Sequence, residues 1–207
     1  MLAPVKLYLA SSNPGKLAEF RALAADAGAG NMSLEPIPEF TSVAAFEEGA
    51  PTFAENALGK ALHYSEFRGG LVIADDSGLV VPALGGAPGV HSARYAGPRA
   101  SNEQRIAKLL DEMRGLRGDS RAAYFVCVIA VVRGRRGVAI VSDRIDGQIL
   151  DAPQGYGGFG YDPVFWFSES GKTFAELSRD EKNKYSHRGR AFRRVLKVLL
   201  GSKDLRA

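Results

Sequence analysis

Leu71-Val72-Ile73-Ala74-Asp75-Asp76-Ser77-Gly78 joins a short apolar run to two adjacent carboxylates and a small turn. The apolar run predicts a buried β-strand, which we expect to end at Ala74 and to resume after the turn at Leu79. Burying a carboxylate without a partner is costly, so two of them beside a buried strand indicate a cation site or a catalytic role. Aspartates that only cap the backbone of a turn would have the same sequence.

Helical and strand patterns alternate before this stretch. Residues 5–10 predict a buried strand, and Asn13 followed by Pro14 predicts the start of a helix. Thr52 and Glu55 form a capping-box pattern that predicts a second helix. This alternation is typical of strands that pair in parallel through helical crossovers.

Longer strands dominate the second half of the chain. Residues 122–133 and 138–149 predict an antiparallel hairpin, and further helices are expected to begin near Ser101, Thr173 and Ser186. The order of these elements favours an α/β protein with a mixed β-sheet flanked by helices.

Composition and charge exclude several classes of protein. Hydrophobic residues make up 45% of the 207 residues, which is ordinary for a folded globular protein. No stretch approaches the ~20 apolar residues that span a bilayer, and the N-terminus has no signal-peptide pattern. We therefore expect a cytoplasmic protein with no membrane partner. No linker or low-complexity segment divides the chain, so we expect a single domain over residues 1–207.

The net charge of +4 is small, and a nucleic-acid interface would need a broader basic stripe with aromatic residues between the charges. We expect no nucleic-acid partner. The single cysteine, Cys127, lies in an apolar run and is interpreted as a buried strand thiol.

A first candidate site is the segment Ser11-Ser12-Asn13-Pro14-Gly15-Lys16, where a strand gives way to a helix. The free backbone N–H groups and the dipole of a helix N-terminus favour phosphate, and Lys16 adds a positive charge. The spacing is not that of a Walker A loop. A well-capped helix without a ligand would have the same residues, so both interpretations stand.

The acidic pair suits a metal. Carboxylate oxygens are ligands that Mg²⁺ prefers, and a neighbouring carboxylate can accept the proton of an attacking water. Glu47 and Glu48 precede the second helix and could supply a further metal carboxylate, although an exposed acidic loop is the alternative. Lys60 could face phosphates or solvent.

Two later segments suggest recognition of a base. In Gly157-Gly158-Phe159-Gly160-Tyr161-Asp162-Pro163, glycines allow close approach of a ligand and Phe159 offers a stacking face. Lys182, His187 and Arg188 supply mainly hydrogen-bond donors, and a pocket of donors prefers a carbonyl on the base to an amino group. A packed turn and a basic helix N-terminus with a surface histidine are the alternatives.

Taken in order, six segments resemble the inosine/xanthosine triphosphate pyrophosphatase family over nearly the whole chain. They are Ser-Ser-Asn-Pro-Gly-Lys (11–16), Phe-Ala-Glu-Asn-Ala (53–57), Ala-Asp-Asp-Ser-Gly-Leu (74–79), Pro-Gly-Val-His-Ser-Ala-Arg-Tyr-Ala-Gly (88–97), Gly-Gly-Phe-Gly-Tyr-Asp-Pro-Val-Phe (157–165) and Ser-His-Arg-Gly-Arg-Ala (186–191). The resemblance implies a Mg²⁺-dependent hydrolase that splits ITP, dITP and XTP into the monophosphate and pyrophosphate, and so sanitises the nucleotide pool. It also implies two α/β lobes around a long mixed sheet, a substrate cleft between the lobes, and a homodimer.

The resemblance assigns roles to individual residues. Asp76 is the general base and a metal ligand, and Glu47 is the other metal carboxylate. Whether Asp75 or Glu48 also contacts the metal is left open. The residues expected to touch substrate are Ser11, Ser12, Asn13, Pro14, Gly15 and Lys16 at the triphosphate, Ser77, then Phe159, Gly160, Tyr161 and Asp162 at the base and ribose, and Lys182, His187 and Arg188 at the base.

Two other classes remain as rivals. A nucleotide-binding sensor without turnover would explain the phosphate segment and Phe159, but not a carboxylate pair that faces a polyanion. An RNA-binding module would use the basic C-terminal helix, and its RNA affinity would depend steeply on salt.

Overall fold

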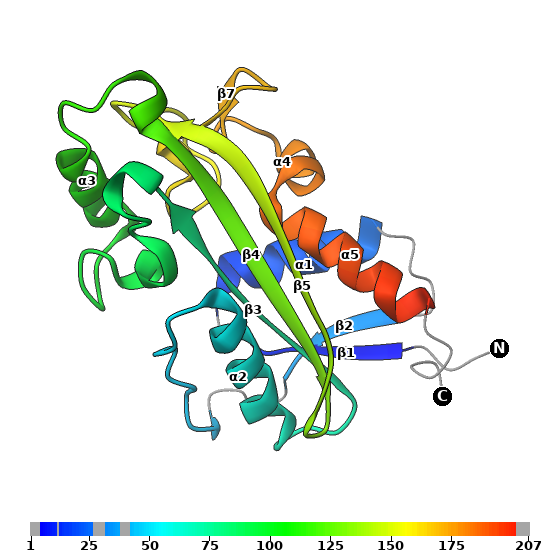
Figure 1. Cartoon of the computed structure of the whole chain (residues 1–207). Coiled ribbons are helices and arrows are strands. Elements are labelled where there is room, and N and C mark those ends of the chain that lie inside the picture. The colour runs from blue at the N-terminus through cyan, green and yellow to red at the C-terminus, as the bar shows by residue number, and fades with distance from the viewer. Residues whose placement is uncertain (1–4, 12, 27–31, 38–41, 202–207) are drawn as a thin grey trace. The chain divides into compact units, whose positions relative to one another are not determined.

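The computed structural model describes residues 5–11, 13–26, 32–37 and 42–201 (Figure 1). Its strands are β1 (Val5–Leu9), β2 (Met32–Pro36), β3 (Leu71–Val80), β4 (Ala122–Arg133), β5 (Arg136–Ile149), β6 (Phe165–Phe167) and β7 (Lys172–Thr173). Its α-helices are α1 (Pro14–Asp26), α2 (Phe53–Ser65), α3 (Asn102–Glu112), α4 (Arg179–Tyr185) and α5 (His187–Gly201). Short 3₁₀ turns include Pro82–Leu84, Gly89–Arg94, Gly118–Arg121 and Asp162–Val164.

The strands form one seven-stranded sheet in the order β2-β1-β3-β4-β5-β6-β7. β1 pairs in parallel with β2 and β3, whereas β6 pairs antiparallel with β5 and β7. β4 and β5 are neighbours joined by a tight turn, as the hairpin prediction required. The predicted α/β fold with a mixed sheet flanked by helices is confirmed.

The chain packs as two compact units. The first contains residues 1–76, 127–143 and 188–207, and the second contains residues 77–126 and 144–187. Strands β3, β4 and β5 each contribute residues to both units.

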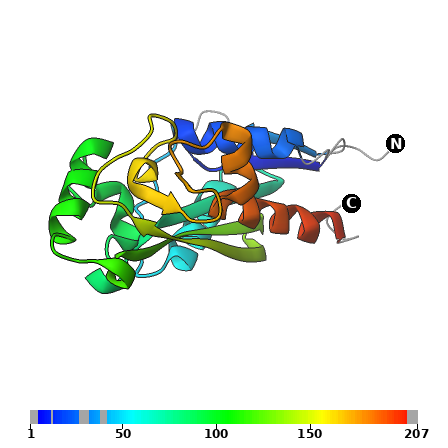
Figure 2. The ribbon, with the colours of Figure 1, turned by 90° about the horizontal axis from the view of Figure 1, so that it is seen from above.

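In the first unit, helices cover both faces of the strands. Leu7 of β1 and Ile73 of β3 belong to one hydrophobic core with Phe20 of α1 and Phe192 of α5, whose rings lie 5.3 Å apart. Figure 2 shows α1 and α2 on opposite sides of the strands. Because neighbouring residues of a strand point to opposite faces, Asp75 lies on the α1 and α5 face and the next residue lies on the α2 face.

The core of the second unit contains a cluster of aromatic residues. Phe125 of β4 lies 4.5 Å from Phe165 of β6 between ring centroids, and Phe165 lies 4.9 Å from Phe174. Ile106 and Leu109 of α3 belong to the same core. This packing holds α3 beside the segment that follows β5.

Two predictions of local structure are wrong. The acidic stretch is no turn, because β3 runs without interruption from Leu71 to Val80. Both aspartates are therefore strand residues on opposite faces. The helix expected near Thr173 is also absent: Thr173 ends β7, and the Glu176 carboxylate accepts a hydrogen bond from the Thr173 backbone in a turn. The capping box that opens α4 is Ser178 with Glu181.

The other predicted helix starts are confirmed. Thr52 caps α2 by accepting from the Glu55 backbone, and Ser101 forms a reciprocal capping box with Gln104. Helix α5 begins directly after Ser186. Gly28, a residue type that typically ends a helix and so predicts the end of the first helix, lies outside the described residues.

Candidate functional site

Asp75 is fully buried on β3 and has two cationic neighbours. Its Oδ2 lies 2.8 Å from Lys16 Nζ and 3.6 Å from Arg188 Nε. Burial alone would raise the pKa of Asp75, but the charges of Lys16, Arg188 and Lys60 hold this pKa well below its usual range. Asp75 is therefore an ionised counter-charge inside the first unit.

Asp76, the next residue, is 5% exposed and has the opposite chemistry. Burial and then the negative charge of Glu48 raise the pKa of Asp76 to about 6, although Lys16, Lys60 and a hydrogen bond with Asn56 act against the rise. A carboxylate with a pKa close to neutral is suited to accept a proton in catalysis.

The N-terminus of α1 carries the predicted phosphate segment. Asn13 Oδ1 accepts a hydrogen bond from the Lys16 backbone at 3.1 Å, and Ser11 Oγ accepts one from the Asn13 backbone at 3.3 Å. The first turn, which contains Pro14 and Gly15, has no acidic residue to offset the positive end of the helix dipole. Ser12 lies outside the described residues.

Residues 44–49, which precede α2 and are called the acidic segment, approach the same face of β3 as Asp76. Glu48 forms an ion pair with Lys60 of α2, and its charge contributes to the raised pKa of Asp76. Lys60 is buried, so the alternative of a solvated helix lysine is wrong. Glu47 is exposed and is not one of the main causes of the raised pKa of Asp76.

Asp76 and Glu48 suit a hard divalent cation, because carboxylate oxygens are ligands for Mg²⁺. A cation would also relieve the repulsion between the two carboxylates. Within residues 5–11, 13–26, 32–37 and 42–201, no group of three or more His, Cys, Asp or Glu gathers as a metal cluster. Mg²⁺ commonly takes one or two carboxylates and completes its shell with water and substrate phosphates, so it needs no such cluster.

In the second unit, Asp162 organises the glycine-rich loop. Its Oδ2 accepts hydrogen bonds from the Phe159 backbone at 2.7 Å and from Lys182 Nζ at 2.6 Å. The Lys182 ammonium also lies 4.6 Å from the centre of the Phe159 ring. The structure thus brings together three of the residues predicted to recognise the base.

Tyr161 and His187 are buried in the second unit. The Tyr161 hydroxyl donates to the Ser92 carbonyl at 3.0 Å, and burial raises the pKa of Tyr161. The His187 ring stacks on Phe125 at 4.9 Å between centroids. The alternative of a surface histidine is therefore wrong. Gly160 has open space where a Cβ would stand, and Ser77 is half-buried on β3.

Arg188 follows His187 but makes its ion pairs in the first unit. Its guanidinium pairs with Glu19 of α1 and with Asp75. Burial would lower the pKa of Arg188, but the two carboxylates raise it above its usual range. Arg188 and Lys16 therefore share Asp75 as a partner.

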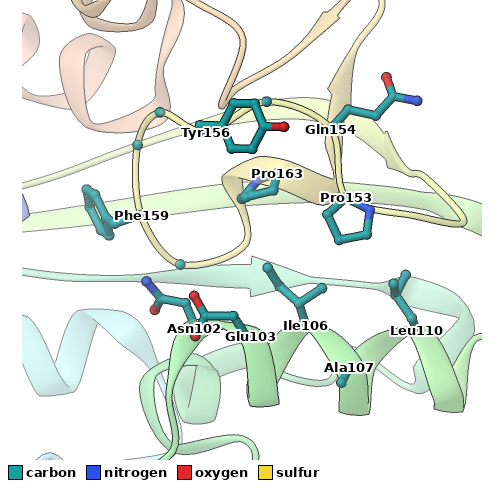
Figure 3. Close-up of a pocket in the computed structure, with 14 residues that line it drawn as sticks. Asn102, Glu103, Ile106, Ala107, Leu110, Pro153, Gln154, Tyr156, Phe159 and Pro163 are labelled. Carbon is teal, nitrogen blue, oxygen red and sulfur yellow. The ribbon is translucent and has the colours of Figure 1, made fainter.

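A cavity of about 610 Å³ lies between α3 and the glycine-rich loop (Figure 3). The helix contributes five residues, which include Ile106 and Leu110, and the loop contributes Tyr156, Phe159 and Pro163 among others. Phe159 therefore belongs to a wall that borders open space.

Known proteins resemble this chain in sequence and in fold. A model of the Ham1 family matches residues 7–198. The chain belongs to the Ham1 family. The dITP/XTP pyrophosphatase of Geobacillus kaustophilus is 50% identical over 190 residues, which cover 92% of each protein.

Solved structures of similar proteins agree with the fold. A HAM1 protein from Coxiella burnetii superposes with a TM-score of 0.85 at 40% identity, covering 96% of this chain and 100% of that one. A nucleoside-triphosphatase / dITP/XTP pyrophosphatase from Mycobacterium abscessus has a TM-score of 0.71 at 38% identity, covering 94% and 100%. None of the described helices is long and apolar enough to cross a membrane.

Two residues that shape this candidate site are not predicted by the sequence. Glu19, which pairs with Arg188, lies one helical turn after Lys16 on α1, and a carboxylate at that spacing from a lysine is the only signal of this kind in the α1 sequence. Ser92, whose carbonyl accepts from the Tyr161 hydroxyl, lies in the 3₁₀ turn Gly89–Arg94 and carries no comparable signal.

Proposed function

We propose that this chain hydrolyses dITP, XTP and ITP to the nucleoside monophosphate and pyrophosphate, by cleavage of the α–β phosphoanhydride. The observation that carries the proposal is Asp76, a nearly buried carboxylate whose pKa is raised to about 6 beside Glu48 and Lys60. Membership of the Ham1 family and its dITP/XTP pyrophosphatase relatives support the same reaction. Such an enzyme removes deaminated purine nucleotides from the nucleotide pool.

In this mechanism Asp76 is the general base. It accepts the proton of the attacking water, a role that is worth about 10²–10⁴-fold in rate. Its raised pKa supports the role, because a stronger base takes a proton from water more readily than an ordinary surface aspartate does.

The proposed metal is Mg²⁺, with Asp76 as one ligand. Glu47 is the second ligand that the family motif predicts, and the electrostatic coupling of Glu48 to Asp76 supports Glu48 as a further candidate. When bound, Mg²⁺ supplies positive charge against the phosphate oxygens.

The first unit binds the triphosphate in this proposal. The N-terminus of α1, with Ser11, Asn13 and Gly15, offers backbone and side-chain donors to phosphate oxygens. Lys16 adds a cation that is already oriented by its ion pair with Asp75.

The second unit recognises the base. Phe159 stacks on the purine, while Lys182 and His187 donate hydrogen bonds to its carbonyl groups. Asp162 supports this role because it holds both the Phe159 backbone and the Lys182 ammonium. Arg188 is the third proposed base-recognition residue, and its ion pair with Asp75 lets it steady the catalytic strand as well.

A panel of triphosphates with and without Mg²⁺, with products separated by chromatography, tests the proposal. We expect IMP and pyrophosphate from ITP, with ATP and GTP turned over slowly. IDP and orthophosphate would contradict the reaction type. Binding of ITP without any turnover would favour the rival nucleotide sensor.

We also propose that the chain acts as a homodimer in the cytoplasm, as the family resemblance implies. The small net charge of +4 supports a nucleotide rather than a nucleic acid as its polyanionic partner.

A further inference from the structure

Gly59 lies in the middle of α2, where only proline is less favourable than glycine. Phe46, in the acidic segment, provides a reason. A Cβ at position 59 would lie 2.6 Å from Phe46 Cζ and 3.2 Å from Phe46 Cε2. The end of the Phe46 ring therefore packs directly on the helix backbone, and any larger residue than glycine would displace it.

Two further side chains of α2 hold the same segment. The Asn56 amide accepts a hydrogen bond from the Ala50 backbone at 2.9 Å and donates one to the Ala50 carbonyl at 3.2 Å. His63 Nε2 lies 2.7 Å from the Ala44 carbonyl, to which it donates, and its ring lies 5.8 Å from that of Phe46.

These residues form one stripe along α2. Asn56, Gly59, Lys60 and His63 follow the spacing i, i+3, i+4, i+7, so they share a face of the helix. Residues 44–49 form neither helix nor strand, and the shape of this segment therefore depends on contacts of this kind. Lys60 completes the stripe through its ion pair with Glu48.

We propose that Gly59, Phe46 and His63 are positioning residues that seat the acidic segment on α2 and thereby place the Glu48 carboxylate beside Asp76. None of the three touches the reacting atoms. The packing of the acidic segment on α2 follows from the contacts alone. The effect of this packing on Mg²⁺ binding rests on the proposed function.

The decisive variant is Gly59→Ala, measured in two ways. In the metal-free protein, the Ala50 amide should exchange with solvent faster by NMR, because its hydrogen bond to Asn56 depends on the seated segment. In the enzyme, the Mg²⁺ concentration for half-maximal turnover should rise about tenfold, the size typical of losing a residue that orients metal ligands. Gly69→Ala is the matched control, because its new Cβ meets nothing within 4 Å.

Phe46→Leu supplies a rescue, because leucine lacks the Cε and Cζ atoms that the new methyl group would strike. The Gly59→Ala and Phe46→Leu double variant should therefore lose less than the sum of the two single variants. His63→Gln, which keeps a donor, should retain more Mg²⁺ affinity than His63→Leu, and this pair decides the matter if Gly59→Ala does not fold.

Unchanged amide exchange in Gly59→Ala, or strictly additive effects in the double variant, would overturn the seating. Faster exchange of the Ala50 amide with an unchanged Mg²⁺ requirement would overturn the role of the acidic segment at the metal. The product identity of the wild type tests the proposed function separately, because the exchange measurement needs neither metal nor nucleotide.

Discussion

Asp75 and Asp76 differ in chemistry because a strand turns successive side chains to opposite faces. Asp75 meets Lys16 and Arg188, so its ionised form is stabilised. Asp76 is also buried but meets the negative charge of Glu48, so its ionised form is destabilised. A difference of one position along β3 thus separates a counter-charge from a proposed base.

Asp76→Asn should lose about 10²–10⁴-fold in turnover and yet stabilise the metal-free protein at pH 8. The folded pKa of about 6 exceeds the unfolded value of 3.8, so the contribution of Asp76 to stability is present at low pH and is lost as the pH rises through 6. Removing the charge should therefore add on the order of 1–3 kcal/mol to the free energy of unfolding. Urea denaturation in the presence of a chelator measures this gain, which should shrink at pH 5.

Asp75→Asn is the matched control, for which the expected change in the free energy of unfolding has the opposite sign. Its folded pKa is lowered, so its contribution to stability is present above pH 3.8 and is lost as the pH falls below that value. The variant leaves Lys16 and Arg188 without their shared counter-charge and should be less stable than the wild type at pH 8. A change of the same sign in both variants would contradict the assignment of the two aspartates.

The glycine-rich loop shows how an element depends on one backbone conformation. Gly158 has a φ of +72°, and a Cβ there would lie 2.1 Å from Asp162 Oδ2. That oxygen holds both the Phe159 backbone and Lys182. The loop therefore needs glycine for its conformation and for the space that Asp162 occupies.

Gly158→Ala should displace Asp162 and raise the KM for ITP at least tenfold, with a smaller change in kcat, because the residues that it disturbs are proposed to bind the base. Steady-state kinetics measure the two constants. Gly171→Ala is the control: its φ of +63° carries a similar backbone cost, about 1–2 kcal/mol, but its Cβ meets nothing within 4 Å. An equal effect of both variants on KM would show that backbone strain alone is responsible.

For the whole molecule, the proposed homodimer has a direct measurement. Light scattering at micromolar concentration should give twice the chain mass of 22.2 kDa. Exposed apolar side chains such as Phe67 and Ile140 offer surface that association could remove from water. A mass of one chain across the range of concentrations used for the assay would contradict the dimer.

Much of the fold follows from the sequence because its signals are local. The caps at Thr52 and Ser101, the hairpin and the inward face of α5 each depend on residues a few positions apart. The two wrong predictions also relied on local signals, which pairing between strands overrides. Thr173 and Glu176 do form a side-chain cap, but pairing of β7 with β6 keeps Thr173 in a strand. Likewise, β3 passes through a pair of aspartates that would favour a turn in isolation.

The residue types at the candidate site can also be predicted from the sequence: carboxylates after an apolar run, a capped helix with Lys16, and a glycine-rich loop with Phe159. The different roles of the two aspartates cannot be predicted in this way, because a pKa depends on distances through space. Folding sets Lys16 and Arg188 against Asp75, and Glu48 with Lys60 near Asp76, although these residues are scattered along the sequence. The charges that distant segments bring to each aspartate, rather than the identity of either residue, distinguish the proposed base from its neighbour.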